Sequence, residues 1–282
     1  MYMKNALVIA SVALGNAQAG ATRLRSLTDL VVCSSDVAQV GYDAVMPPLI
    51  NAFNSAWPQL AASSGIDPLT GVSIPNVDIP CKYGGDEICG LQASSCDKSW
   101  VQMDFNYLNG LGDLEIASYN LGTIDTNTSS CDSNSLPAGA SCGYHATPAM
   151  TADLISGGKL EANLQNLKFK VKCKDAFGSK FDETIASFSS VTCKSTDATA
   201  TMDSSVCGSN CNIFSASVSN LKISSSTKVT CDVSGLSSSI VDLVVPTIQS
   251  TLFNVVEPIA ESEMNKELSN LIGTGYPNAT CT

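Results

Sequence analysis

The chain has 282 residues, of which 44% are apolar and 15% are charged, and its formal net charge is −11 at pH 7. This length and apolar content are enough for one large domain or two small ones with a substantial core. The acidic balance argues against nucleic-acid binding, which needs a basic face. It equally disfavours electrostatic docking on anionic membranes or on bacterial outer-leaflet lipids.

Residues 1–19, MYMKNALVIASVALGNAQA, have the features of a secretory signal peptide. Lys4 precedes an apolar stretch at residues 6–14, and the small-residue pattern AQA at 17–19 is typical of a cleavage site. The apolar stretch is too short to span a bilayer. We therefore expect a secreted protein whose single domain covers residues 20–282.

All 12 cysteines lie behind this segment, together with a single histidine, His145. An even number of cysteines in a secreted chain predicts a disulfide framework, whereas a zinc site would need the C-x-x-C pair or second histidine that this sequence lacks. Twelve cysteines allow on the order of ten thousand pairings. Among these, Cys207–Cys211 and Cys131–Cys142 are the pairs that short loops favour. The cysteines expected in disulfides are Cys33, Cys81, Cys89, Cys96, Cys131, Cys142, Cys173, Cys193, Cys207, Cys211, Cys231 and Cys281.

Two N-glycosylation sequons stand in polar surroundings, Asn127-Thr128-Ser129 and Asn278-Ala279-Thr280. A secreted chain would carry a glycan at either asparagine if its host glycosylates such sites.

The first predicted element of the mature chain is helical, over residues 36–62. Asp36 is a suitable N-cap. Pro47-Pro48 should break or kink the helix, because proline lacks an N–H and its ring clashes with the preceding turn. The sequence therefore predicts two short helices meeting there, or a turn followed by a helix from Pro48 to about Ala62. The apolar residues at helical spacing are Val37, Val40, Ala44, Leu49, Ile50, Phe53 and Trp57.

The middle of the chain is predicted to form antiparallel strands. Residues 100–107 and 167–174 alternate apolar and polar side chains, which places one face on the core and the other in water. The segment DAFGSK at 175–180 is typical of the turn of a hairpin, which would join residues 160–174 to residues 181–193.

Two of these segments are alike. ANLQNLKFKVK at 162–172 and ASVSNLKISSS at 216–226 share Asn-Leu-Lys followed by an apolar residue, and in both the apolar positions change parity at the asparagine. Such a change within a continuous strand indicates a β-bulge, which lets a long strand curl. The alternative is a chance similarity between two short amphipathic strands.

A long apolar helix is predicted near the C-terminus. From Leu236 to Ile272 apolar residues recur at steps of three and four, and Gly273 is a good helix stop. Pro246 and Pro258 should kink it, giving one long bent helix or two in series. Its serines, Asp242 and central proline disfavour a transmembrane span, so we expect it to lie inside the protein.

This order of elements resembles the tubular lipid-binding superfamily, which includes bactericidal permeability-increasing and lipopolysaccharide-binding proteins and the insect takeout and juvenile-hormone-binding proteins. The resemblance is carried by SNLKIS, by QNLKFKV and by LVVPTIQSTLFNVVEPIAESEMNKEL. It implies an α+β fold in which a long curled antiparallel sheet wraps a long C-terminal helix, with an N-terminal helix and, here, disulfide staples. The length suits a single module like the insect proteins. The 12 cysteines depart from the family, whose members often have few. The acidic charge departs from the basic tip of the endotoxin-binding members, so the resemblance implies binding of a lipid or other hydrophobic ligand but not endotoxin binding.

An apolar sheet face opposite an apolar helix leaves an elongated cavity if the two do not close, and a filled core if they do. The side chains expected to line the cavity are Leu49, Phe53, Met103, Phe105, Leu167, Phe169, Val171, Leu221, Ile223, Ile240, Val244, Ile248, Leu252, Phe253, Val256 and Ile259.

No catalytic or cofactor motif stands out. G-x-S-x-G is absent, His145 is expected in a surface loop, and Glu261 and Glu263 are explained by solvation of a helix face. We therefore expect no enzyme and no cofactor or metal. The favoured hypothesis is a secreted carrier of a lipid or other apolar small molecule, with transient membrane contact. The alternative is a disulfide-rich extracellular recognition or coat protein that has a filled core and acts through its loops.

Overall fold

The computed structural model describes residues 33–79, 81, 96–120, 122–125, 131, 142–175, 177–209, 212–225, 229–233 and 238–273. The signal peptide and both sequons, at Asn127 and Asn278, lie outside these residues. So do Cys89, Cys211 and Cys281.

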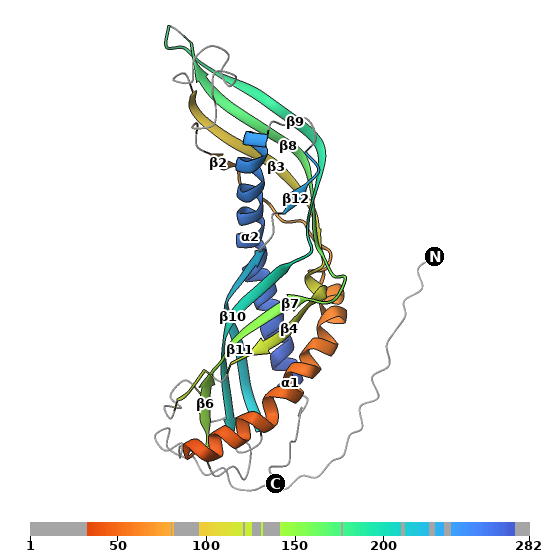
Figure 1. The fold of residues 1–282 in the computed structure, drawn as a ribbon, viewed down its shortest axis with the longest axis vertical. Coiled ribbons are helices and arrows are strands. Elements are labelled where there is room, and N and C mark those ends of the chain that lie inside the picture. The colour runs from red at the N-terminus through yellow and green to blue at the C-terminus, as the bar shows by residue number, and fades with distance from the viewer. Residues whose placement is uncertain are drawn as a thin grey trace, which may run out of the picture.

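The fold is α+β, as predicted, with two antiparallel sheets and a helix near each end of the described chain. Six strands form each sheet, and the sheets follow one another along the long axis of the molecule (Figure 1). The first sheet contains β1 (Leu69–Thr70), β2 (Val77–Ile79), β3 (Cys96–Asn109), β8 (Leu160–Lys174), β9 (Lys180–Ser195) and β12 (Thr230–Cys231). The second contains β4 (Leu114–Tyr119), β5 (Thr123–Asp125), β6 (Tyr144–Thr147), β7 (Ala149–Leu154), β10 (Ala198–Ser209) and β11 (Asn212–Ser225).

The C-terminal helix α2 (Ser238–Gly273) is a single helix that runs beside both sheets (Figure 1). It contains Pro246 and Pro258 and ends at the predicted glycine. One face of the helix, from Val244 to Leu268, is apolar and buried. The sequence left open one bent helix or two in series, and the structure has one.

The N-terminal helix α1 (Ser35–Ser64) lies against the second sheet and contains Pro47 and Pro48 without a break. The prediction of two helices, or of a start at Pro48, was wrong. Burial of one continuous face explains the difference, since Tyr42, Phe53 and Trp57 are each at most 2% exposed. Apolar burial of this extent outweighs the hydrogen bonds that proline removes. The predicted cap was also wrong, because the helix starts before Asp36, with Ser34 at the N-cap.

The strands follow the predicted alternation. Residues 100–107 lie in β3 and residues 167–174 in β8, and β8 and β9 form the predicted hairpin. Its turn is held by Asp175, whose Oδ1 accepts hydrogen bonds from the backbone N–H groups of Phe177 and Ser179.

The two matching segments contain matching β-bulges. Asn166 in β8 and Asn220 in β11 have φ angles of 50° and 54°, in the left-handed region. At each asparagine the strand register shifts by one residue against the neighbouring strand. The Asn166 Nδ2 donates to Asp104 Oδ2 at 2.8 Å, and the Asn220 Nδ2 donates to Asp203 Oδ2 at 2.9 Å. The predicted bulges are therefore confirmed, and the same local structure occurs once in each sheet.

Helical asparagines pair with both edges of the second sheet. Asn265 of α2 accepts from the backbone N–H of Val218 in β11 at 2.7 Å and donates to the carbonyl of the same residue at 2.9 Å. Asn54 of α1 makes the same pair of bonds with Ile116 in β4, at 2.9 and 3.0 Å. Each side chain thus satisfies two backbone groups that an edge strand would otherwise leave open.

Two glutamates extend this pairing along β11. Glu257 accepts from the backbone N–H of Ile223 at 2.9 Å and from the Lys222 ammonium at 2.7 Å. Glu261 accepts from the backbone N–H of Leu221 at 3.1 Å. Solvation alone therefore does not explain Glu261, contrary to the sequence-based expectation. We call Glu257, Glu261 and Asn265 the α2 polar stripe.

The disulfides join distant parts of the chain. The described pairs are Cys33–Cys142, Cys81–Cys96, Cys131–Cys207 and Cys193–Cys231. The predicted local pairs Cys131–Cys142 and Cys207–Cys211 were wrong, because Cys142 pairs with Cys33, 109 residues away, and Cys131 pairs with Cys207, 76 residues away.

Replacing either bulge asparagine by valine should lower the free energy of unfolding by about 2 kcal/mol. The left-handed conformation costs a residue with Cβ about 1–2 kcal/mol, and the hydrogen bond to the aspartate is lost as well. Asn166→Gly and Asn220→Gly, which tolerate the conformation, should cost about 1 kcal/mol or less. Urea denaturation of the four variants measures this. Equal losses for valine and glycine would contradict the conformational explanation.

Asn265→Leu should lower the free energy of unfolding by about 2–3 kcal/mol, because it leaves the N–H and C=O of Val218 without the side chain that satisfies them. Asn54→Leu should have a similar effect at the other edge. The matched control is Asn254→Leu, an exposed position on α2, where a change within about 0.5 kcal/mol is expected. A control as destabilising as Asn265→Leu would show that the helix surface in general, and not the edge pairing, is responsible.

Candidate ligand-binding site

Three hollows lie along α2. One lies between both helices and the second sheet, one between α2 and the first sheet, and one beside the first turns of α2. We call them the α1 pocket, the α2 pocket and the groove.

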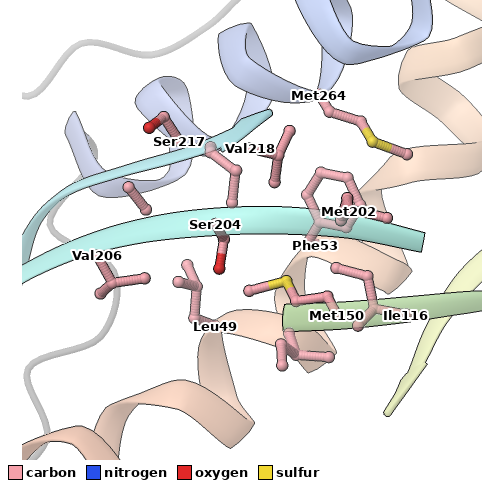
Figure 2. A pocket seen from close by; sticks show the side chains of 13 residues that line it. Leu49, Phe53, Ile116, Met150, Met202, Ser204, Val206, Ser217, Val218 and Met264 are labelled. Atoms are coloured by element: carbon pink, nitrogen blue, oxygen red, sulfur yellow. The ribbon is translucent and has the colours of Figure 1, made fainter. Parts of the chain in front are cut away.

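The α1 pocket lies where α1 and the second half of α2 meet the second sheet (Figure 2). Phe53 from α1, Met202 from β10 and Met264 from α2 point toward one another (Figure 2). The cavity that remains between the side chains is about 10 Å³, which is room for one water molecule at most. Its lining residues are Leu49, Ile50, Phe53, Ile116, Met150, Met202, Ser204, Val206, Ala216, Ser217, Val218, Met264 and Leu268.

The α2 pocket lies between the middle of α2 and the first sheet. It is almost as small, with a cavity of about 20 Å³. Apart from Lys194, Ser195 and Gln249, its walls are apolar or sulfur-containing. They are formed by Leu108, Leu160, Ala162, Cys193, Val229, Ile248, Leu252 and Phe253.

The groove is much larger, at about 330 Å³. This volume falls at the lower end of the range of about 300–1,000 Å³ that is typical of small-molecule sites. Val229 and Gln249 line both the groove and the α2 pocket, so the two hollows adjoin. The residues lining the groove are Val229, Thr230, Cys231, Val241, Asp242, Val245, Pro246 and Gln249.

The walls of the groove are fixed by β12 and by one face of α2. β12 pairs with β9 at Thr230 and Cys231, and the Cys193–Cys231 disulfide ties the two strands together. On α2, Val241, Val245 and Gln249 recur every fourth residue, so they share one face of the helix.

The charges around the groove are unevenly distributed. Asp242 is the one charged side chain among the eight described lining residues. The nearby Lys194 is paired, since its ammonium lies 3.3 Å from Glu161 Oε2. The Lys159 ammonium, together with that of Lys194, holds the pKa of the Glu161 carboxyl below its usual range, while partial burial acts in the opposite direction.

The predicted lining residues divide between these hollows and the solid core. Leu49 and Phe53 line the α1 pocket, and Ile248, Leu252 and Phe253 line the α2 pocket. Phe105 and Ile259 are partly buried, and the Ile240 side chain lies outside the described part. The others are buried in the core and line none of the three hollows, namely Met103, Leu167, Phe169, Val171, Leu221, Ile223, Val244 and Val256.

The groove residues were missed by the sequence analysis. β12 has two residues, too few to give an alternating pattern. Val241 and Val245 belong to the apolar run that predicted α2, but the sequence shows no difference between a residue packed in the core and one beside an opening.

The expectation that His145 lies in a surface loop was wrong. The residue lies in β6, and its side chain is buried, with 7% exposed. Its Nε2 lies 2.8 Å from the Ser205 hydroxyl of the neighbouring β10, while its Nδ1 has no hydrogen-bond partner among the described residues. A catalytic histidine is normally oriented by a third group at the second nitrogen.

Two tyrosines lie buried between α1 and the second sheet. Burial raises the pKa of the Tyr42 and Tyr144 hydroxyls, which therefore stay protonated at physiological pH. Among the described residues neither hydroxyl has a hydrogen-bond partner.

The described part of the chain contains no group of three His, Cys, Asp or Glu side chains placed to hold a metal ion. Among the described residues, no helix combines the length and apolar character needed to cross a membrane.

Comparison with known proteins gives a distant likeness. No family model matches the chain, and no curated relative is found. Among solved structures, the crystal structure of lipopolysaccharide binding protein is similar over 84% of this chain, with 13% sequence identity and a TM-score of 0.30. The chain spans 40% of the length of that protein. That protein is of a kind named in the sequence resemblance, but at this TM-score membership of the superfamily stays a prediction.

Proposed function

We propose that the protein is a secreted, non-enzymatic carrier that binds a lipid or other hydrophobic molecule in the groove and beneath α2. The observation that carries the proposal is the groove itself. It has the volume of a small-molecule site and mainly apolar walls, and it adjoins the apolar α2 pocket through Val229 and Gln249.

Apolar burial supplies the affinity in this proposal. Each buried methylene of the ligand contributes about 0.8 kcal/mol to the free energy of binding. A ligand whose apolar tail packs on Val241 and Val245 therefore needs few polar contacts. A longer tail extends from the groove into the α2 pocket when the side chains of Gln249 and Phe253 change rotamer. Phe253 is 9% exposed, at the margin of the core.

An extracellular location agrees with the covalent framework. The four described disulfides are typical of proteins that fold in an oxidising compartment. Together with the N-terminal signal pattern, they support secretion. A carrier that exchanges its ligand with a bilayer would contact the membrane transiently.

The second candidate function is a disulfide-rich extracellular recognition or coat protein that acts through its surface loops. It is favoured by the small α1 and α2 pockets, whose cavities of about 10 and 20 Å³ leave the core almost filled. In that case the groove would be a surface depression without an occupant.

Native mass spectrometry of the secreted, purified protein should reveal an extra mass that solvent extraction identifies as a hydrophobic molecule. The ligand-free protein should also bind the neutral apolar dye N-phenyl-1-naphthylamine, because the walls of the groove are mainly apolar. A ligand-free mass together with no uptake of the dye would favour the filled-core alternative.

Val241→Trp places a large ring in the groove and should weaken dye binding at least tenfold. Asn254→Trp, on an exposed part of α2, serves as the control and should bind like the wild-type protein. Circular dichroism and thermal unfolding establish that both variants are folded. Unchanged binding by folded Val241→Trp protein would contradict the proposed location of the ligand.

The absence of catalysis is a separate prediction. Ser205 should resist labelling by a fluorophosphonate, and the protein should not hydrolyse p-nitrophenyl esters, because in the described part of the chain no group at His145 Nδ1 orients the ring. Ser205→Ala is the control for any background reaction. Labelling that disappears in this variant would show that the Ser205–His145 pair is a reactive centre and would refute the non-enzymatic assignment.

A further inference from the structure

We propose that the tip of the β8–β9 hairpin docks on a lipid bilayer by inserting the phenyl ring of Phe177 among the acyl chains. The proposal rests on the proposed function, since a carrier of hydrophobic molecules exchanges them with a bilayer, and it names the surface that makes this contact. The described residues that line the groove do not belong to the hairpin tip, so the two sites can be tested separately.

The exposure of Phe177 is the first step. Among the described residues it is the most exposed large apolar side chain, at 94%, and Phe181 of the same hairpin is 45% exposed. The hairpin reaches one end of the long axis of the molecule, whereas α1 begins at the other end (Figure 1). An exposed aromatic ring at the end of an elongated molecule can enter another phase before the rest of the surface meets it.

The turn holds the ring in this position. The backbone N–H of Asp175 donates to the carbonyl of Ser179 at 2.9 Å, and the N–H of Gly178 donates to the carbonyl of Asp175 at 3.0 Å. Gly178 has a φ of 84°, a conformation that glycine adopts without strain. These bonds add to the two that Asp175 Oδ1 accepts. Because the backbone is already ordered, little conformational entropy is lost when the ring meets a partner.

The charges at the base of the turn suit the depth of the lipid head groups. Lys174 and Lys180 stand opposite each other there, and their ammoniums lie 2.8 and 2.7 Å from the two carboxylate oxygens of Asp97. Lysine stems can lie along apolar surface while the ammoniums stay in water. The carboxylates of Asp97 and Asp175 offset the two positive charges. Docking therefore depends on the ring of Phe177 and does not require anionic lipid, in agreement with the acidic charge of the chain.

The small size of the apolar tip favours a bilayer over a protein partner. A phenylalanine side chain buries at most about 250 Å², whereas a stable protein interface buries about 800 Å² on each partner. Phe177 and the half-exposed Phe181 fall short of that area. Insertion into a bilayer needs no complementary surface, and the weak binding that results suits a transient contact.

The first test places a fluorescent reporter at the tip of the full-length secreted protein. On addition of palmitoyl-oleoyl phosphatidylcholine vesicles, the emission of Phe177→Trp should shift to shorter wavelength, and lipids brominated on their acyl chains should quench it. Val40→Trp is the matched control, because Val40 is 55% exposed near the start of α1, and its emission should not change. Trp57 and Trp100 contribute the same background to both variants.

The second test measures flotation with the same neutral vesicles. Phe177→Ser should reduce the bound fraction about tenfold, as expected for the loss of one buried aromatic side chain, while its circular dichroism and dye binding match those of the wild-type protein. Vesicle binding through Phe177 without dye binding would refute the groove as the ligand site and support the docking tip. The inference is overturned if wild-type and Phe177→Ser protein float equally, if neither floats, or if both reporters are quenched alike. It is also overturned if Phe177 instead mediates a dimer in sedimentation without lipid.

Discussion

The second sheet of this protein depends on helical side chains that take the place of neighbouring strands. An open strand edge exposes unpaired N–H and C=O groups, which invite pairing with another chain. Here Asn54 pairs with β4 and the α2 polar stripe pairs with β11. Because these bonds are directional, they also fix the position of α2 along its own axis relative to the second sheet. That position places Met264 and Leu268 in the α1 pocket and, about three to six turns earlier, Ile248 and Leu252 in the α2 pocket.

The bulges let the sheets accommodate this helix. At each one, two residues of one strand face a single methionine of its neighbour, Met103 in the first sheet and Met202 in the second. The extra residue changes which side of the strand faces inward and bends the strand. The following apolar residues, Leu167 and Leu221, are therefore each 2% exposed although the preceding alternation would have turned them outward. The repeated Met-Asp and Asn-Leu-Lys pairs make the two sheets alike in construction.

Elements with a local pattern could be predicted, and features that depend on distant contacts could not. The apolar periodicity of α2, the alternation in β8 and the change of parity at Asn166 and Asn220 are all visible in short windows of sequence. The continuity of α1 through Pro47-Pro48 is not, because it depends on tertiary burial that outweighs a local penalty. The disulfides fall in the same class, since Cys33 pairs with Cys142 across 109 residues of sequence. The groove also required the fold, because it arises where the two-residue β12 faces α2.

The distribution of these contacts along α2 bears on how a ligand would enter. The polar stripe holds the helix from Glu257 to Asn265, whereas the groove lies along Val241 to Gln249. Between the first turns and the stripe stands Pro246, which cannot donate the helical hydrogen bond to the preceding turn. A displacement of the first turns would therefore widen the passage between the groove and the α2 pocket without breaking the bonds to β11. An almost filled core is therefore compatible with a binding function. The first turns of α2, which would move to admit a ligand, are separate from the turns that hydrogen-bond to the second sheet.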